Sequence, residues 1–241
     1  MLSVAFITCV NNQQLYQQCL THLAALDKQG FSVEVVPVQS SVSITNAYNR
    51  AMLKSNAKYK VYLHQDTFIL EPLFLHHIHR IFSSDPGIGM IGMLGGRNMP
   101  LDENKLMWFW DCAEIYGKVF LPSLNQSLGG KPTPNPYEWV TVIDGCLMVT
   151  QYDIPWREDI FDGFHYYDLS QSIEFWKRDL KVIVPRQENS WASHICHQKC
   201  DSEYYRLRKK FINEYRPYLV KNVKKGSYGF SYNSKKYRFI V

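Results

Sequence analysis

The first third of the chain alternates hydrophobic runs with amphipathic segments, and this alternation limits the fold more than any other feature. Residues 4–10, 31–38 and 59–63 have the apolar character of buried strands. The two segments between them repeat apolar residues at helical spacing. These positions are Leu15, Cys19, Leu23 and Leu26, ahead of Gly30, and then Ile44, Ala47, Tyr48 and Ala51. Strands joined by helices imply right-handed crossovers, so we predict an α/β fold with a mostly parallel central sheet and helices on both faces.

The second half of the chain gives a weaker version of the same pattern. The further expected elements are a helix that opens at Pro72, strands at 88–93, 139–149 and 181–184, and a helix at 168–178. Residues 95–137 hold several Gly and Pro residues. We predict that this stretch is a long irregular excursion and interpret it as a substrate loop or lid, because long loops in compact domains are usually functional or mobile.

Length and composition indicate a globular protein. The 241 residues, of which 46% are hydrophobic, suffice for one large domain or for a domain with an appendage. No run of eighteen apolar residues occurs, and the chain enters a strand-like segment directly after Met1, without a basic leader. We therefore expect a cytoplasmic protein. Its six scattered cysteines suit reduced thiols better than a disulfide framework.

Positive charge is concentrated in the last forty-one residues. Residues 201–241 contain eleven Lys or Arg and three Asp or Glu, a balance of +8, whereas residues 1–200 carry −3. We predict one domain over 1–200 and a basic, aromatic-rich extension over 201–241. Such a composition suits contact with phosphate groups, anionic lipid headgroups or single-stranded nucleic acid. A solvated helix face followed by a terminal hairpin explains it equally well.

Polar side chains recur where the predicted strands end. They are Thr8, Asn11, His64, Asp66, Asp144, Asp168 and His194. Open α/β sheets bind ligands outside the carboxyl ends of their strands, so we expect one site built from several loops. Asp66 and His194 offer an oxygen and an imidazole suited to Mn²⁺ or Mg²⁺. We expect a helix N-terminus to keep Asp168 ionised, so that it can accept a proton.

Taken in order, these motifs resemble the inverting family 2 glycosyltransferases with a GT-A fold. The matching segments are 4–12, 47–51, 63–66 (Leu-His-Gln-Asp), 143–145 (Ile-Asp-Gly) and 164–168 (Phe-His-Tyr-Tyr-Asp), followed by His194. Within that family the chain is most similar to the small bacterial glycosyltransferase-like branch whose strand-end motif reads His-Gln-Asp. The resemblance covers about residues 1–197 and leaves the basic extension outside.

The resemblance implies roles for the candidate residues. Asp66 takes the place of the last aspartate of the family's Asp-x-Asp motif and would bind the divalent cation, with His194 completing the site. Asp168 would be the catalytic base, because Ser170 replaces the second acid of its motif. His64 stands where the family has an aspartate, so it would contact either the ribose or the donor sugar. Asp144, with Gly145, would approach the donor sugar or the acceptor.

The resemblance also implies the ligands. Thr8 and Asn11 would face the nucleotide, and the expected donor is a UDP-linked sugar, although residues 38–41 lack the acid that commonly contacts uracil. The expected acceptor is a saccharide or lipid-linked saccharide in bacterial surface polysaccharide synthesis, with peripheral membrane contact through the basic extension and no nucleic acid partner. Three tryptophans, Trp108, Trp110 and Trp139, are candidates for stacking on sugar rings or for core packing.

Two other functions, and one zinc site, fit parts of the sequence. A nucleotidyltransferase shares the strand and helix pattern, but the segment after the first strand has neither glycine nor lysine. A non-catalytic, degenerate GT-A binding or scaffold module would explain His64 and Ser170. The potential ligands at 194–200 suggest zinc, but no second ligand pair at a suitable spacing accompanies them, so we do not predict a zinc site.

Overall fold

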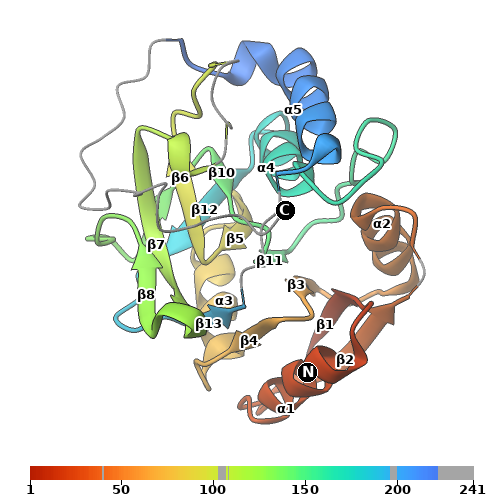
Figure 1. Cartoon of the computed structure of the whole chain (residues 1–241). Coiled ribbons are helices and arrows are strands. Elements are labelled where there is room, and N and C mark those ends of the chain that lie inside the picture. Colours follow the sequence, from red (N-terminus) through yellow and green to blue (C-terminus); the bar gives the residue numbers. More distant parts are fainter. Residues whose placement is uncertain (40, 103–106, 108, 196–199, 222–241) are drawn as a thin grey trace.

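A seven-stranded sheet forms the centre of the computed structural model, which describes residues 1–39, 41–102, 107, 109–195 and 200–221 (Figure 1). The strand order is β2-β1-β3-β11-β5-β12-β9. The strands are β1 (Leu2–Cys9), β2 (Phe31–Val38), β3 (Tyr59–His64), β5 (Ile88–Gly92), β9 (Tyr137–Trp139), β11 (Leu147–Thr150) and β12 (Lys181–Pro185). The predicted α/β class is therefore confirmed.

The direction of the strands adds a detail to the predicted sheet. Strand β1 lies parallel to β2 and β3, and β12 lies parallel to β5. However, β11 inserts antiparallel between β3 and β5, and β9 is antiparallel to β12. Five of the seven strands therefore point the same way, so the sheet is mostly parallel as predicted, and the two reversed strands make it mixed. The hydrophobicity of a short buried run does not encode its direction, and so the sequence pattern could not reveal this reversal.

Helices cover both faces of the sheet, as predicted. They are α1 (Gln13–Ala24), α2 (Ile44–Lys54), α3 (Phe74–Ser84) and α4 (Tyr167–Trp176). Because side chains alternate along a strand, Val4 and Phe6 pack in one core with α1 and α3, while Ala5 and Ile7 pack in another with α2 and α4. Asn12 caps α1 by accepting hydrogen bonds from two backbone N–H groups, and Ser43 caps α2 in the same way with one.

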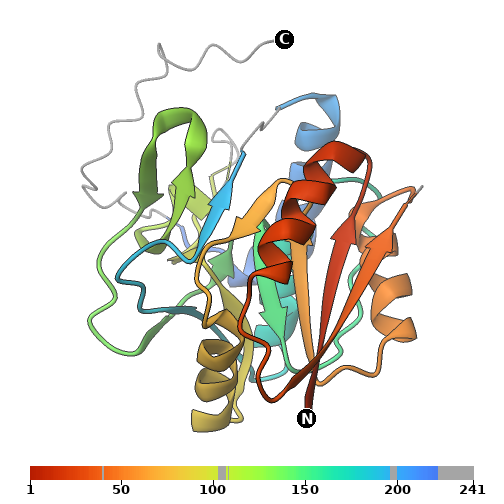
Figure 2. The same ribbon diagram turned by 90° about the horizontal axis from the view of Figure 1, so that it is seen from below.

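A second sheet takes three of its strands from the predicted irregular excursion. Its order is β10-β6-β7-β13-β4, and β8 pairs with β7. These strands are β4 (Thr67–Ile69), β6 (Leu94–Arg97), β7 (Glu114–Leu121), β8 (Gln126–Gly129), β10 (Val142–Ile143) and β13 (Ala192–His194). Figure 2 shows the β7–β8 hairpin in green, with β13 between it and α1. The prediction of an irregular stretch was wrong for the residues of β6, β7 and β8, which pair in strands despite their Gly residues, whereas 98–102 and 130–136 lie outside helices and strands.

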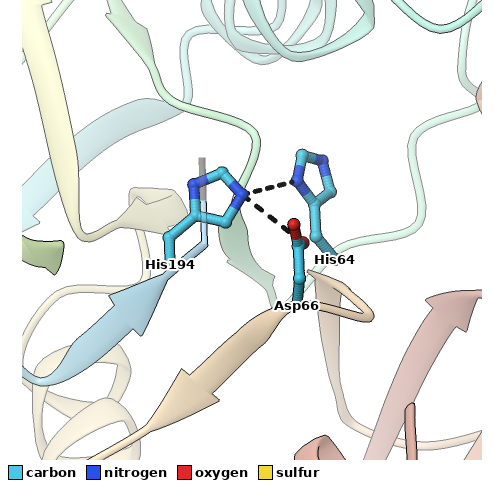
Figure 3. Close-up of side chains that lie close together, drawn as sticks. All are labelled: His64, Asp66 and His194. Carbon is cyan, nitrogen blue, oxygen red and sulfur yellow. Dashed lines mark hydrogen bonds and ion pairs between the residues drawn. The ribbon is translucent and has the colours of Figure 1, made fainter. Parts of the chain in front are cut away.

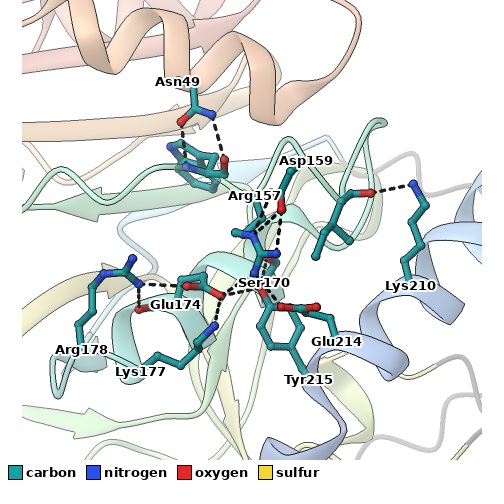
Figure 4. Close-up of polar contacts among 12 residues, drawn as sticks. Asn49, Arg157, Asp159, Ser170, Glu174, Lys177, Arg178, Lys210, Glu214 and Tyr215 are labelled. Atoms are coloured by element: carbon teal, nitrogen blue, oxygen red, sulfur yellow. Dashed lines mark hydrogen bonds and ion pairs between the residues drawn. The ribbon is translucent and has the colours of Figure 1, made fainter.

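The described part of the basic extension packs on α4. Helix α5 (Ser202–Tyr215) buries Tyr204, Leu207, Phe211 and Tyr215 in the same core as β1 and α1. Figure 4 shows the polar contacts that join the two helices. The Tyr215 hydroxyl lies 2.8 Å from Ser170 Oγ and donates to Glu174 at 3.0 Å, and Arg157 binds both Glu174 and Glu214 at 3.2 and 2.8 Å. A domain boundary at residue 200 stays a prediction.

No helix within the described ranges is long and apolar enough to cross a membrane.

Candidate functional site

A cavity of about 710 Å³ opens where β1 and β3 end and where α4 and α5 begin. Seven of the residues predicted from sequence line it. They are Asn11, His64, Asp66, Asp144, Gly145, Asp168 and His194. The eighth, Thr8, does not, because its side chain is fully buried in β1. Residues that are up to 183 positions apart in the chain are thus gathered at the carboxyl ends of β1 and β3, and two of them, Asp144 after β10 and His194 in β13, come from strands outside this sheet.

Two histidines and one carboxylate converge on one side of this cavity (Figure 3). His194 Nε2 lies 3.3 Å from His64 Nδ1 and 3.5 Å from Asp66 Oδ1. The three donor atoms are all within 4.8 Å of one another. Asp144 and Cys146 form a second such group with His194. Two imidazole nitrogens that face each other beside a carboxylate are a donor set that fits a divalent transition-metal cation.

The local fold fixes these three side chains. His64 is the last residue of β3, and a two-residue turn presents Asp66 before β4 begins. Strand β13 pairs antiparallel with β4 so that His194 lies opposite Thr67, one residue from Asp66. The position of His194 beside the carboxylate therefore follows from strand register and does not depend on a flexible loop.

Gln65 is a site residue that the sequence did not reveal. Its side-chain oxygen accepts hydrogen bonds from the backbone N–H groups of Asn11 and Asn12, at 3.0 and 2.8 Å, and its amide nitrogen donates to the Asn11 side chain. The middle residue of the His-Gln-Asp motif thus ties the end of β3 to the loop after β1. An amide has no signature in sequence until its partner, here more than fifty residues away, is known.

Burial and mutual contact set the charges of the three residues. Burial and the neighbouring His194 lower the pKa of His64 to about 4. Burial also opposes protonation of His194, but its contacts with Asp66 and Asp144 outweigh this effect and raise its pKa. For Asp66, the effect of burial is outweighed by His194 and the pKa is lowered. A neutral His64 and an ionised Asp66 are the protonation states that bind metal, and the raised pKa of His194 means that a cation would compete with its protonation.

Asp168 lies in the first turn of α4, on the same cavity. Its Oδ2 accepts a hydrogen bond from the Gly145 N–H at 2.9 Å. Burial and the nearby Asp144 raise the pKa of Asp168 to about 7, although backbone hydrogen bonds oppose that shift. This corrects the expectation that the helix N-terminus keeps the group strongly ionised: desolvation and like charge dominate. A carboxylate with a pKa near neutrality is suited to general-base work.

Gly145 is required by the packing above it. The Tyr167 hydroxyl donates to the Gly145 carbonyl at 3.3 Å and also contacts His64 Nε2. A Cβ atom at position 145 would lie 2.2 Å from the Tyr167 hydroxyl oxygen and 3.0 Å from the Asp168 Cβ. Glycine therefore lets the loop approach α4 closely enough for its N–H to reach Asp168. It also leaves Tyr167 free to orient His64.

Several other residues that were considered for the site make their contacts outside the cavity. Ser170 faces Tyr215 and not the cavity. Trp139 stacks on Trp176 with ring centroids 4.6 Å apart, and Trp110 packs on Phe109, so neither tryptophan lines the cavity. Trp108 and residues 196–199 lie outside the described residues. The aromatic side chains that do line the cavity are Phe109, Phe164, Tyr166, Tyr167 and Tyr204.

The mixed sheet with a ligand cavity at its strand ends defines an α/β protein with the GT-A glycosyltransferase fold. The chain belongs to the Glycosyltransferase like family, whose profile matches residues 5–215 and so includes α5. Membership of the small bacterial branch with a His-Gln-Asp motif stays a prediction. No curated protein matches the sequence.

Solved structures share the fold at low sequence identity. TarS residues 1–349 from S. aureus in complex with UDP are 11% identical, with a TM-score of 0.53, over 88% of this chain and 66% of that TarS segment. The structure of GalNAc-T7 with UDP, GalNAc and Mn²⁺ is 10% identical, with a TM-score of 0.59, over 90% of this chain and 49% of that protein. The chain thus spans less than two thirds of either relative.

Proposed function

We propose that this protein is a metal-dependent inverting glycosyltransferase that moves a hexose from a nucleotide-diphosphate sugar to an acceptor hydroxyl. One observation supports it above all: a metal-binding triad and a carboxylate with a raised pKa face the same cavity. Paired groups whose environments push their pKa values in opposite directions are typical of acid and base sites. Here the pKa of Asp66 is lowered, which favours its ionised form, and the pKa of Asp168 is raised to about 7.

The cation would be held by Asp66 and His194, joined by His64. When bound, it acts as a Lewis acid that neutralises negative charge on the diphosphate. None of the described residues that line the cavity is Lys or Arg, so among them no permanently charged side-chain cation is available for that role. Two imidazoles in the donor set favour Mn²⁺ over Mg²⁺, which prefers oxygen ligands. Asp144 lies next to the triad and contributes negative charge.

Asp168 would remove the proton from the acceptor hydroxyl. The acceptor oxygen forms a bond to the anomeric carbon, the bond from that carbon to the diphosphate breaks, and the proton passes to the carboxylate. Because attack and departure take place on opposite faces of the sugar, the configuration inverts. General-base assistance of this kind is worth about 10²–10⁴-fold in rate. The Gly145 N–H holds the carboxylate in place throughout.

The donor is proposed to be UDP-linked. Structures of the same fold contain UDP or UDP-GlcNAc in TarS, and UDP with Mn²⁺ in GalNAc-T7. Asn11, Val38 and Ser41, which lie just beyond β1 and at or beyond the end of β2, line the part of the cavity proposed for the nucleoside. Thr8, fully buried, is left out of this proposal.

For the acceptor we propose a saccharide or lipid-linked saccharide of bacterial surface polysaccharide synthesis, used at the cytoplasmic side of the membrane. The basic extension supports this, because cationic side chains near a membrane surface are attracted to anionic lipids. The exposed cations on the described part of the extension include Arg206 and Lys209 on α5. Nucleic acid is not proposed as a partner.

Calorimetry with UDP- and GDP-sugars, with and without Mn²⁺, tests the proposal. We expect metal-dependent donor binding by the parent protein. Asp168→Asn should bind donor with similar affinity but lose nearly all transfer. A non-catalytic scaffold would show no metal-dependent heat, and transfer by Asp168→Asn at the parental rate would rule out its role as base.

A further inference from the structure

One wall of the cavity is formed by the segment before α4 and by the start of α5. Phe164, Glu203 and Tyr204 line this wall, whereas Asn11 and Val38 line the part next to β1 and β2. A base must lie within hydrogen-bond reach of the hydroxyl that it activates. Asp168 is four residues from Phe164, in the first turn of the helix that follows it, so an acceptor that enters from this side lies along this wall when it reaches Asp168.

Phe164 is the exposed aromatic ring of this wall. Its side chain is 49% exposed, whereas Phe109, Tyr166, Tyr167 and Tyr204, the other aromatic residues around the cavity, are all buried. Covering such a ring with the apolar face of a ligand removes apolar surface from water, which is favourable. The ring therefore offers an uncovered flat apolar surface beside the catalytic carboxylate.

The backbone around this ring is held from two sides. The Phe164 N–H donates to Glu203 Oε2 of α5 at 3.2 Å, and the Gly163 carbonyl accepts from the Ile44 N–H of α2 at 3.2 Å. A Cβ atom at position 163 would lie 2.5 Å from Glu203 Oε1, so glycine is what allows this approach. The ring is thus presented by a fixed segment, as a binding surface requires.

The charge around this wall selects among sugars. Glu203 and Asp201 are carboxylates, burial lowers the pKa of His165 and so favours its neutral form, and none of the described residues that line the cavity is a Lys or Arg. Arg206, which does not line the cavity, lies 4.0 Å from Glu203. A neutral pyranose places its apolar C–H face on an aromatic ring and donates hydroxyl hydrogens to carboxylates. A sugar that carries a carboxylate would be repelled here.

We propose that Phe164 is the platform on which the acceptor sugar packs, held by Glu203, and that this wall selects neutral sugars over acidic ones. This inference rests on the proposed transferase function and adds the acceptor class and the residue that recognises it.

The test measures release of nucleotide from UDP-sugars with Mn²⁺ in the presence of methyl glycosides. The neutral acceptors are methyl glucoside, methyl galactoside and methyl N-acetylglucosaminide, and methyl glucuronide is the acidic counterpart. We expect neutral acceptors to accelerate release above hydrolysis and the glucuronide to be at least about tenfold poorer in kcat/KM. Phe164→Ala should raise the acceptor KM about tenfold while the donor KM stays within about twofold, and Phe164→Trp should restore the acceptor KM.

Tyr205→Ala is the matched control, because Tyr205 is an aromatic residue of α5 with similar exposure, 45%, that does not line the cavity. Its acceptor KM should equal that of the parent. The proposal is wrong if Phe164→Ala transfers with an unchanged acceptor KM, if the glucuronide is preferred, or if no neutral glycoside accelerates release. A parent protein that neither binds nor consumes any sugar nucleotide with Mn²⁺ would instead overturn the transferase function, and the platform with it.

Discussion

Replacing the proposed base should make the protein more stable at neutral and alkaline pH. The pKa of Asp168 is raised from 3.8 to about 7 by burial and by Asp144. Between these values the folded protein keeps a proton that the unfolded chain gives up. The stabilisation from this proton is complete below pH 3.8 and is lost as the pH rises through 7. At pH 8 the fold therefore bears the full cost of ionising a desolvated carboxylate.

The size of this cost follows from the shift. About three pKa units correspond to about 4 kcal/mol, and partial exposure of the Asp168 side chain reduces this to about 2–4 kcal/mol. Asp168→Asn removes the ionisable group and can still accept the Gly145 N–H through its amide oxygen. We expect the melting temperature of the variant to exceed that of the parent by about 5–10 °C at pH 8, and the two to converge near pH 4.

Thermal unfolding followed by circular dichroism between pH 4 and 8.5, without metal, measures the difference. Asp66→Asn is the opposite control, because the pKa of Asp66 is lowered and its ionised form is stabilised by the fold. That variant should be less stable than the parent at pH 8, with a gap that closes as the pH falls through the native pKa. A gap for Asp168→Asn that does not change with pH, or that favours the parent at pH 8, would refute the reasoning.

Four further outcomes test the site and its support. The rate of transfer should rise with pH through about 7 as Asp168 loses its proton, and a pH profile of kcat/KM that is flat from 5.5 to 8.5 would contradict this. His194→Ala should weaken Mn²⁺ binding more than about tenfold in calorimetry, and unchanged affinity would remove this residue from the metal site. Gly145→Ala should lower the free energy of unfolding in urea by about 1–3 kcal/mol, because its Cβ collides with a tyrosine hydroxyl. Glu174→Ala should lower the free energy of unfolding by about 1–3 kcal/mol, because it removes the buried carboxylate that binds both Arg157 and Tyr215, although Arg157 keeps Glu214 and Asp159; a change below about 0.5 kcal/mol would show that the network is not stabilising.

The sequence predicted what depends on periodicity and on strand ends. The helical spacing that begins at Ile44 gave α2, and the end of a hydrophobic run gave His64 and Asp66, because parallel strands open toward one edge. Thr8 shows the limit of that reasoning. It shares a strand face with Val4 and Phe6 and is therefore buried, which the period of two along β1 already implied.

Features that need a distant partner could not be predicted. Gln65 and Phe164 acquire their roles from groups 39–54 residues away, and neither residue type carries a signal of its own. The packing of α5 was easier to predict from the sequence. Tyr204, Leu207, Phe211 and Tyr215 lie three and four residues apart and mark one apolar face, but the many cations around them drew attention to charge.

The insertion of β11 between β3 and β5 has a consequence for how the chain folds as the ribosome makes it. The neighbour that closes the edge of β3 is synthesised more than eighty residues after His64, whereas β1 and β2 are already complete when β3 emerges. At about 5–20 residues per second, Tyr62 and Leu63 spend on the order of ten seconds in a strand with an open edge. Nascent chains of this protein should therefore need chaperone protection until Leu147–Thr150 arrives, and both sheets can close only after that point.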